Sequence, residues 1–474
     1  MRVYNSLGSK KEEFAPIEPG KVIMYVCGLT PYDDAHLGHA RTYIAFDIIK
    51  RYLIYKKFKV THIQNITDVE DKIINRAKQT KRNPIELAEE FHKKAMELFK
   101  KLNVLEADHY PKVSEHMKEI IGIIELLKKK GYAYESSDGV YFDVSKFKEY
   151  GKLSKQKLDK HIQSDRQGED KKEPTDFALW KKGKDIINFE SPFGEGRPGW
   201  HIECSAIGTK YAKRTIDIHG GGRDLMFPHH ENEVAQSEAA YGKQFVKYWM
   251  HTGFITVNGE KMSKSLGNFI TIKEILSKHD PNGVRIFFAL THYKSPIDYS
   301  EKEIEAAEKT VERIFGTVER LKEYSKNGNT GKERFSKHIE EFYKWMDDDF
   351  STPEALASLF GLIKELNIAL DKEGLTKEAK QYLEVEMKNI FGILGLKKVE
   401  KTLEEKREQI EGLAKEFGLK VSKDLEKMLD FIIEKREEAR KKKEFSKADA
   451  IRNKLKELGI ELEDDSKGAK YKII

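Results

Sequence analysis

Residues 22–64 read VIMYVCGLTPYDDAHLGHARTYIAFDIIKRYLIYKKFKVTHIQ, and this stretch predicts a β-α-β unit. It opens with the apolar run 22–26, which is typical of a buried strand. Residues 40–55 are amphipathic and predict a helix, and residues 60–64 predict a second strand. Two strands joined through a helix pair in parallel with a right-handed crossover, so we expect an α/β fold with a Rossmann-like parallel sheet.

The segment between the first strand and the helix predicts a phosphate site. His36-Leu37-Gly38-His39 places two imidazoles beside a helix N-terminus, where unpaired backbone N–H groups favour anions. Gly38 carries no side chain that would block the approach of a phosphate. Taken alone, this four-residue pattern is equally typical of a surface turn.

A second motif lies past the middle of the chain. Residues 261–265 read Lys-Met-Ser-Lys-Ser between Gly259 and Gly267, which is a solvated loop if taken alone. The glycines would let Lys261 and Lys264 close over a triphosphate and stabilise its charge during reaction. Because both motifs occur in one chain and in this order, they suggest ATP activation, and the chain resembles the class I aminoacyl-tRNA synthetases.

The two cysteines of the chain suggest a metal site. Cys27 ends the first strand, and Cys204 lies in Gly-Trp-His-Ile-Glu-Cys-Ser, residues 199–205. A helix beginning at Pro228 would put His229 and Glu233 on one face, so that two thiolates, an imidazole and a carboxylate could meet on one ion. This donor set fits zinc, although the spacing is not that of a zinc finger. The alternative is a pair of small buried hydrophobes and a surface hydrogen bond.

Several further segments resemble the cysteinyl-tRNA synthetase family over nearly the whole chain. They are residues 25–33, 65–72, 198–205, 219–233, 261–265 and 347–356. The resemblance implies that Cys27, Cys204, His229 and Glu233 hold one zinc ion at the base of the amino-acid pocket, where the substrate thiolate binds the metal. It also implies that Thr67, Trp200 and His219 line this pocket.

The implied activity is ATP-dependent ligation of L-cysteine to tRNA(Cys) through a cysteinyl adenylate. In this reading His36, His39, Lys261 and Lys264 are catalytic, and Mg²⁺ accompanies ATP. The loop 222–224 resembles the family's nucleotide loop, so ATP would be bound by His36, Gly38, His39, Asp224 and Lys264. Zinc would separate cysteine from serine, since a purely steric pocket discriminates poorly between near isosteres.

The expected organisation is a catalytic α/β domain with an inserted connective segment, then a helical bundle, then a small C-terminal anticodon-binding domain. We predict the catalytic domain at 1–111 and 199–250, the connective insertion at 112–198, a linking domain with the Lys-Met-Ser-Lys-Ser loop at 251–303, the bundle at 304–400 and the anticodon-binding domain at 401–474. A basic cluster at 439–452 suggests phosphate contacts. Tyr471 is the aromatic expected to stack on an anticodon base.

Composition agrees with a large multidomain enzyme. The 474 residues exceed what one core usually covers, and a net charge of +6 from 86 basic and 80 acidic residues is too small to indicate nucleic-acid binding by itself. No apolar run predicts a membrane span or secretory signal, so we expect a cytoplasmic, monomeric protein. The 35% charged residues suggest heat adaptation.

Two alternative functions are considered. The cysteine ligase of the mycothiol pathway resembles the same catalytic half, but a basic domain after the bundle weighs against it. A noncatalytic RNA-binding relative would keep the fold without chemistry, and the intact motifs weigh against that reading.

Overall fold

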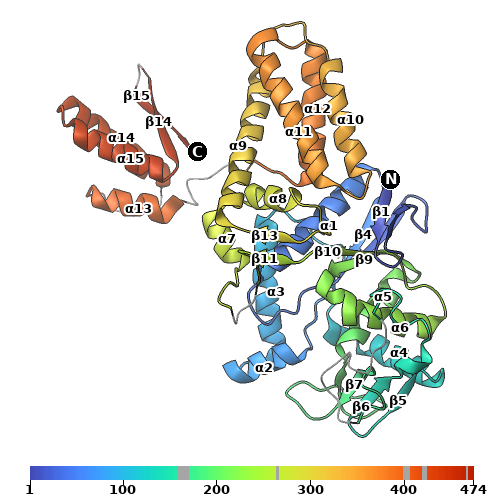
Figure 1. Ribbon diagram of the computed structural model, residues 1–474. Helices are drawn as coiled ribbons and strands as arrows, with labels where there is room; N and C mark the ends of the chain where they lie inside the picture. Colours follow the sequence, from blue (N-terminus) through green and yellow to red (C-terminus); the bar gives the residue numbers. More distant parts are fainter. Residues whose placement is uncertain (157–169, 263–265, 399–405, 419–423, 466–467, 474) are drawn as a thin grey trace. The chain divides into compact units, whose positions relative to one another are not determined.

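The residues expected to form a β-α-β unit do so in the computed structural model (Figure 1). Strand β3 (Lys21–Val26) is followed by helix α1 (Leu37–Tyr55) and strand β4 (Lys59–Ile63). The two strands pair in parallel, with Tyr25 opposite Ile63. The prediction of a parallel α/β sheet is therefore confirmed, and helix α1 begins three residues earlier than the hydrophobic pattern alone suggested.

Two later strands complete the sheet. Strands β9 (Ile216–Gly222) and β10 (Val246–Thr252) give the order β10-β9-β3-β4, with all neighbours parallel. The chain passes from β3 to its neighbour β4 at one edge of the sheet. It passes from β9 to β10 at the opposite edge. The carboxyl ends of β3 and β9 therefore flank the point where the strand order reverses, which is where open α/β sheets bind ligands.

The structure describes residues 1–156, 170–262, 266–398, 406–418, 424–465 and 468–473. The chain divides into two units, Met1–Lys397 and Lys398–Ile474. The other helices and strands of the first unit up to residue 300 are β1 (Arg2–Asn5), β2 (Lys10–Glu13), α2 (Asp71–Thr80), α3 (Pro84–Lys101), α4 (Met117–Lys129), β5 (Ala133–Glu135), β6 (Gly139–Phe142), β7 (Phe177–Lys182), β8 (Gly196–Pro198), α5 (Trp200–Ala212), α6 (Glu231–Tyr241), β11 (Ile255–Val257), β12 (Glu260–Lys261), α7 (Ile272–Lys278), α8 (Pro281–Ala289) and β13 (Ile297–Tyr299).

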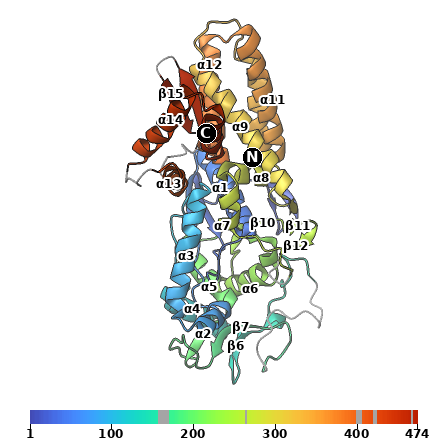
Figure 2. The same ribbon diagram turned by 90° about the vertical axis from the view of Figure 1, so that its left-hand side faces the viewer.

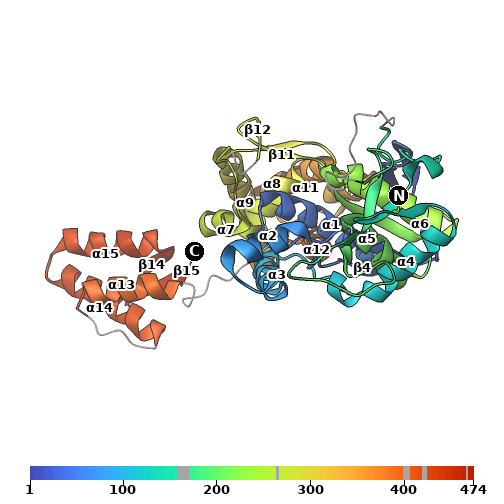
Figure 3. The same ribbon diagram turned by 90° about the horizontal axis from the view of Figure 1, so that it is seen from below.

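The segment between β4 and α5 carries its own antiparallel sheet, in the order β5-β6-β7-β8. Strands β5 and β6 form a hairpin. Residues 157–169 lie outside the described residues. Helices α4, α5 and α6 lie side by side (Figure 3), and α4 and α5 contact strands of this antiparallel sheet. The start of α5 and the residues just before α6 supply Trp200, Cys204 and His229 at the carboxyl edge of the parallel sheet.

Four long helices form a bundle, as the amphipathic pattern predicted. They are α9 (Glu301–Glu323), α10 (Glu333–Met346), α11 (Thr352–Ile368) and α12 (Lys377–Leu394). The stripe Leu356, Leu359, Ile363 and Leu366 is buried. The bundle stands at one end of the first unit and the β5-β6-β7-β8 sheet at the other (Figure 2).

The second unit contains α13 (Arg407–Glu416), α14 (Leu425–Lys441), α15 (Phe445–Glu457) and the antiparallel pair β14 (Ile460–Asp465) and β15 (Gly468–Ile473). Its core includes Met428, Leu429 and Ile451. Tyr471, the aromatic expected to stack on RNA, is half-buried and packs against this core. Phe445 is instead 61% exposed at the start of α15, one residue beyond the basic run 440–443.

Candidate active site and metal centre

A cleft of about 370 Å³ lies at the carboxyl edge of the parallel sheet. Its lining comes from the ends of β3, β4, β9 and β10 and from the first turns of α1, α2 and α5. It brings together most of the predicted site residues: Cys27, His36, Gly38, His39, Thr67, Trp200, Cys204, Asp224 and His229. The convergence expected from the strand order is therefore observed.

The four predicted metal ligands meet at one end of this cleft. Cys27, Cys204, His229 and Glu233 are buried, and one donor atom of each lies within 4.8 Å of all the others. The Glu233 carboxylate is 3.0 Å from His229 Nε2 and 3.9 Å from Cys27 Sγ. Donors bonded to one tetrahedral zinc lie roughly 3–4 Å apart, so this group fits zinc in both chemistry and spacing.

The charges of the four groups favour a cation. The neighbouring Cys27 thiol lowers the pKa of Cys204 to about 6. Burial by itself would lower the pKa of His229, but Cys204 and Glu233 raise it to about 10. Burial would likewise raise the pKa of Glu233, whereas His219 and His229 hold it below its usual value. Burial and the neighbouring Cys204 raise the pKa of the Cys27 thiol. Cys204 and Glu233 are therefore the anionic members of the group, and a divalent cation would bind by displacing the protons of His229 and Cys27.

Three buried histidines that the sequence did not single out surround these ligands. The ring nitrogen Nδ1 of His201 lies 3.0 Å from His229 Nδ1, and His230 Nε2 lies 3.2 Å from Cys27 Sγ. His230 Nδ1 is in turn 2.8 Å from His251 Nε2. Burial lowers the pKa of all three, so they are neutral rings that orient the ligands by hydrogen bonds.

His219 lies behind the ligand group and not at the cleft surface. Its Nε2 is 2.9 Å from Glu233 Oε2, its Nδ1 is 2.8 Å from the Tyr25 carbonyl, and its ring stacks on that of Tyr25 at 4.5 Å. Cys27, His219, His230 and Glu233 form a second overlapping donor group. The role of His219 as a residue that lines the amino-acid pocket stays a prediction.

His36 and His39 cap helix α1 reciprocally. The Gly38 N–H donates to His36 Nδ1 at 3.1 Å, and the His36 N–H donates to His39 Nδ1 at 3.2 Å. With both Nδ1 atoms accepting, the network assigns the ring proton to Nε2 in each neutral imidazole. Burial lowers the pKa of His39, so this ring offers a hydrogen bond and not a positive charge.

Gly38 has a structural role beyond leaving room for phosphate. A Cβ atom at this position would lie 2.9 Å from His36 Cε1. The two imidazole rings stack with centroids 3.7 Å apart, so His36 could move away from such a Cβ only by leaving this stacked position. The glycine is therefore required for the placement of the histidine itself.

The Lys-Met-Ser-Lys-Ser segment follows the strand pair β11–β12. The structure describes the backbone of Lys261 and the side chain of Met262, which lines the cleft. Lys264 lies outside the described residues, as do both serines. Gly259 and Gly267 have φ values of 80° and 68°, which a residue with a side chain rarely adopts. These two positions therefore favour glycine, and the closing of the two lysines over a triphosphate stays a prediction.

Comparison with known proteins identifies the class. The chain matches the family models "tRNA synthetases class I (C) catalytic domain" over residues 13–309, "DALR domain" over 341–398 and "Cysteinyl-tRNA ligase anticodon binding domain" over 422–471. A Mycobacterium tuberculosis methionyl-tRNA synthetase bound by methionyl-adenylate has the same fold, with a TM-score of 0.60 at 14% identity over 79% of this chain and 89% of that one. The fold is that of a class I aminoacyl-tRNA synthetase, and the chain belongs to this class.

Relatives across the whole length define the family. Cysteine–tRNA ligases of Thermococcus kodakarensis and Pyrococcus horikoshii are 49% and 48% identical, each match covering 100% of this chain and 99% of the relative. That of Sulfurihydrogenibium sp. is 46% identical at the same coverage. The chain belongs to the cysteine–tRNA ligase family.

Proposed function

We propose that this protein ligates L-cysteine to tRNA(Cys) at the expense of ATP, through a cysteinyl adenylate. The observation that carries the proposal is the four-donor group at one end of a cleft whose other side holds the His36–His39 motif. A sulfur-selective site beside a phosphate site is the arrangement that activation of cysteine requires. The family membership and the anticodon-binding match over 422–471 support tRNA as the acceptor.

Cys27, Cys204, His229 and Glu233 would hold a single zinc ion. When bound, zinc supplies a partner that prefers a thiolate to a hydroxyl, and this preference would distinguish cysteine from serine. His201 and His230 would fix the orientation of His229 and Cys27. Thr67 and Trp200, which line the cleft, would contact the remainder of the amino acid.

Activation needs no enzyme nucleophile. The cysteine carboxylate would attack the α-phosphorus of ATP, pyrophosphate would leave, and the adenylate would remain bound until the terminal tRNA hydroxyl takes the cysteinyl group. Gly38 admits the phosphates, the Nε2–H groups of His36 and His39 donate to them, and Asp224 would accept from the ribose. Lys261 and Lys264, with Mg²⁺ on ATP, would neutralise the charge on the departing pyrophosphate.

The second unit would bind the tRNA anticodon region. Its basic run at residues 440–443 suits phosphate contacts, and the exposed Phe445 ring beside it suits stacking on a base. This replaces Tyr471, half-buried against the core, as the main candidate for stacking. We keep the six-segment division of the chain given above as a proposal.

The protein is proposed to act as a monomer in the cytoplasm. Within the described part of the chain, no helix is both long and apolar enough to cross a bilayer. A mycothiol-pathway ligase and a noncatalytic RNA-binding relative are less favoured, since the chain combines an anticodon-binding match with a complete donor group.

Cysteine-dependent exchange of pyrophosphate into ATP tests activation, with serine as the matched negative control. Charging of tRNA(Cys) by the same preparation tests transfer, and elemental analysis should find about one zinc per chain. Pyrophosphate exchange without tRNA charging would refute tRNA(Cys) as the acceptor of the cysteinyl group. The absence of pyrophosphate exchange would refute the enzymatic function.

A further inference from the structure

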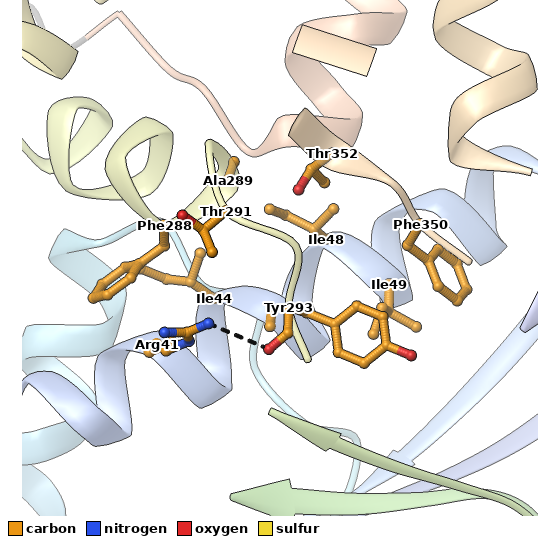
Figure 4. A pocket seen from close by; sticks show the side chains of 11 residues that line it. Arg41, Ile44, Ile48, Ile49, Phe288, Ala289, Thr291, Tyr293, Phe350 and Thr352 are labelled. Atoms are coloured by element: carbon orange, nitrogen blue, oxygen red, sulfur yellow. Dashed lines mark hydrogen bonds between the residues drawn. The ribbon is translucent and has the colours of Figure 1, made fainter. Parts of the chain in front are cut away.

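Arg41 is a buried arginine two residues past the His36–His39 motif. Its side chain is 3% exposed and reaches from α1 into a region lined by Ile44, Ile48 and Phe288 (Figure 4), beside a cavity of only about 20 Å³. Within the described residues no carboxylate pairs with it, and burial lowers its pKa to about 10, which leaves it charged at neutral pH. Burying an unpaired cation is costly, so its contacts need an explanation.

Among the described residues, main-chain carbonyls are the hydrogen-bond partners of the guanidinium. Nη1 donates to the Phe254 carbonyl at 3.1 Å, and Nη2 donates to the Tyr293 carbonyl at 3.4 Å and to the Ser295 carbonyl. The bond to Tyr293 is drawn in Figure 4. The planar fork of arginine can reach several carbonyls at once, which a single ammonium group cannot do equally well.

These carbonyls stand at the base of the strands that carry the Lys-Met-Ser-Lys-Ser segment. Phe254 immediately precedes β11, and Ser295 precedes β13, to which β11 pairs in parallel with Ile255 opposite Ile297. Strand β11 also pairs with β12, whose last residue is Lys261. The two backbones approach closely here, since a Cβ at Gly253 would lie 2.2 Å from the Ser295 carbonyl oxygen.

The far end of the same segment is also fixed to the start of α1. The Leu37 N–H donates to the Ile270 carbonyl at 3.0 Å, and the Ile272 N–H donates to the Ala35 carbonyl at 2.8 Å. Residues 255–269 are therefore held at both ends by one short stretch, residues 35–41, which also carries the phosphate motif. At the N-terminal end of this segment, the side chain of Arg41 makes the contacts.

We propose that Arg41 is a positioning residue, which places the strand pair β11–β12 relative to the His36–His39 motif by holding the Phe254, Tyr293 and Ser295 carbonyls. The inference rests on the proposed function, because it assigns to Arg41 the placement of the strand that ends at Lys261 beside the proposed phosphate site. A displacement of about 1 Å at such a distance from the chemistry can reduce a rate about 100-fold.

The test compares Arg41→Met and Arg41→Lys with Arg51→Met in full-length protein. Arg51 is the control: it lies on the same helix and also donates to two main-chain carbonyls, of Asn103 and Gly392, away from the linking strands. It differs from Arg41 in pairing with the Asp47 carboxylate at 2.8 Å, so its replacement also tests the loss of an ion pair with a buried carboxylate. In pyrophosphate exchange, Arg41→Met should lower kcat about 10- to 100-fold, with the KM for cysteine and the bound zinc unchanged. Arg41→Lys, which keeps the charge, should recover part of kcat, and Arg51→Met should stay within about twofold.

Amide hydrogen exchange gives a second readout that does not depend on activity. Peptides covering 253–262 should exchange faster in Arg41→Met, while peptides covering β3 and β9 should be unchanged. Wild-type kcat in Arg41→Met, or equal losses in Arg41→Met and Arg51→Met that follow thermal stability, would overturn the proposal. If the wild-type protein itself shows no exchange of pyrophosphate, the proposed function fails, while the amide measurement still decides the role of Arg41.

Discussion

Replacing Gly38 by alanine tests how strictly the start of α1 places His36. The new Cβ would lie 2.9 Å from His36 Cε1 and 3.0 Å from His36 Nδ1. Carbon atoms in contact prefer about 3.5–4.0 Å, so His36 would have to move by roughly 0.5–1 Å. It cannot move freely, because its ring stacks on His39 and its Nδ1 accepts the Gly38 N–H.

The expected loss lies in the rate and not in stability. A displacement of about 1 Å can cost about 100-fold in rate, and a tenfold change in rate corresponds to about 1.4 kcal/mol. We therefore expect kcat for pyrophosphate exchange to fall about 10- to 100-fold, or about 1.4–2.7 kcal/mol in activation free energy. Loss of the cap, about 1 kcal/mol, is offset by the better helix propensity of alanine, also about 1 kcal/mol.

The assay measures kcat, the KM for ATP and the thermal midpoint for the wild type, Gly38→Ala and Gly122→Ala. Gly122 lies inside α4, and a Cβ there would meet no atom within 4 Å. This control should gain about 0.5–1 kcal/mol of stability and keep its kcat. A Gly38→Ala enzyme with kcat within twofold of the wild type would refute the argument that the glycine positions His36.

Three further predictions concern the metal, pH and RNA. Cys204→Ser should lose bound zinc and raise the KM for cysteine while the KM for ATP holds; unchanged zinc content in the purified variant would count against the assigned donor group. Burial lowers the pKa of His62 to about 3, whereas in the unfolded chain the pKa is the usual value of about 6.5. The unfolded chain therefore binds the proton first, and stability falls as pH drops below about 6.5. From pH 7.5 to 5.5 this histidine alone should remove about 1.4 kcal/mol. Urea unfolding should show that His62→Leu loses less free energy of unfolding between these two pH values than the wild type, by that amount. Equal losses in the wild type and the variant would contradict the prediction. Phe445→Ala should raise the KM for tRNA about 10-fold, from about 1–3 kcal/mol of stacking, without changing pyrophosphate exchange; equal tRNA charging by both would exclude stacking.

The parallel sheet and the four-donor group could be predicted because their signals are local. The change from an apolar run to an amphipathic stretch identifies β3 and α1. The chemistry of zinc binding points to the two cysteines and to the imidazole and carboxylate that share one helix face as ligands. Parallel strands then bring their carboxyl ends to one edge whatever the separation in sequence.

The surrounding residues could not be predicted because they act across elements. His201, His230 and His251 look like ordinary histidines until α5, α6 and β10 are packed around the ligands. Arg41 reads as one more charge on an amphipathic helix, since its partners are main-chain carbonyls that carry no sequence signal. The stacking role of Tyr471 stays a prediction, and the exposure of Phe445 could not be foreseen because side-chain exposure depends on packing within the C-terminal unit.

The strand order also governs how the protein is made. Tyr25 in β3 lies beside His219 in β9, 194 positions later in the chain. A ribosome adding about 5–20 residues per second needs about 10–40 s to cover that distance. For most of this interval β3 can pair only with β4, its edge toward β9 has no partner strand, and Cys27 has none of the other three ligands. An unpaired strand edge is a site of wrong association, so the N-terminal segment is exposed to aggregation while the rest of the sheet is being made.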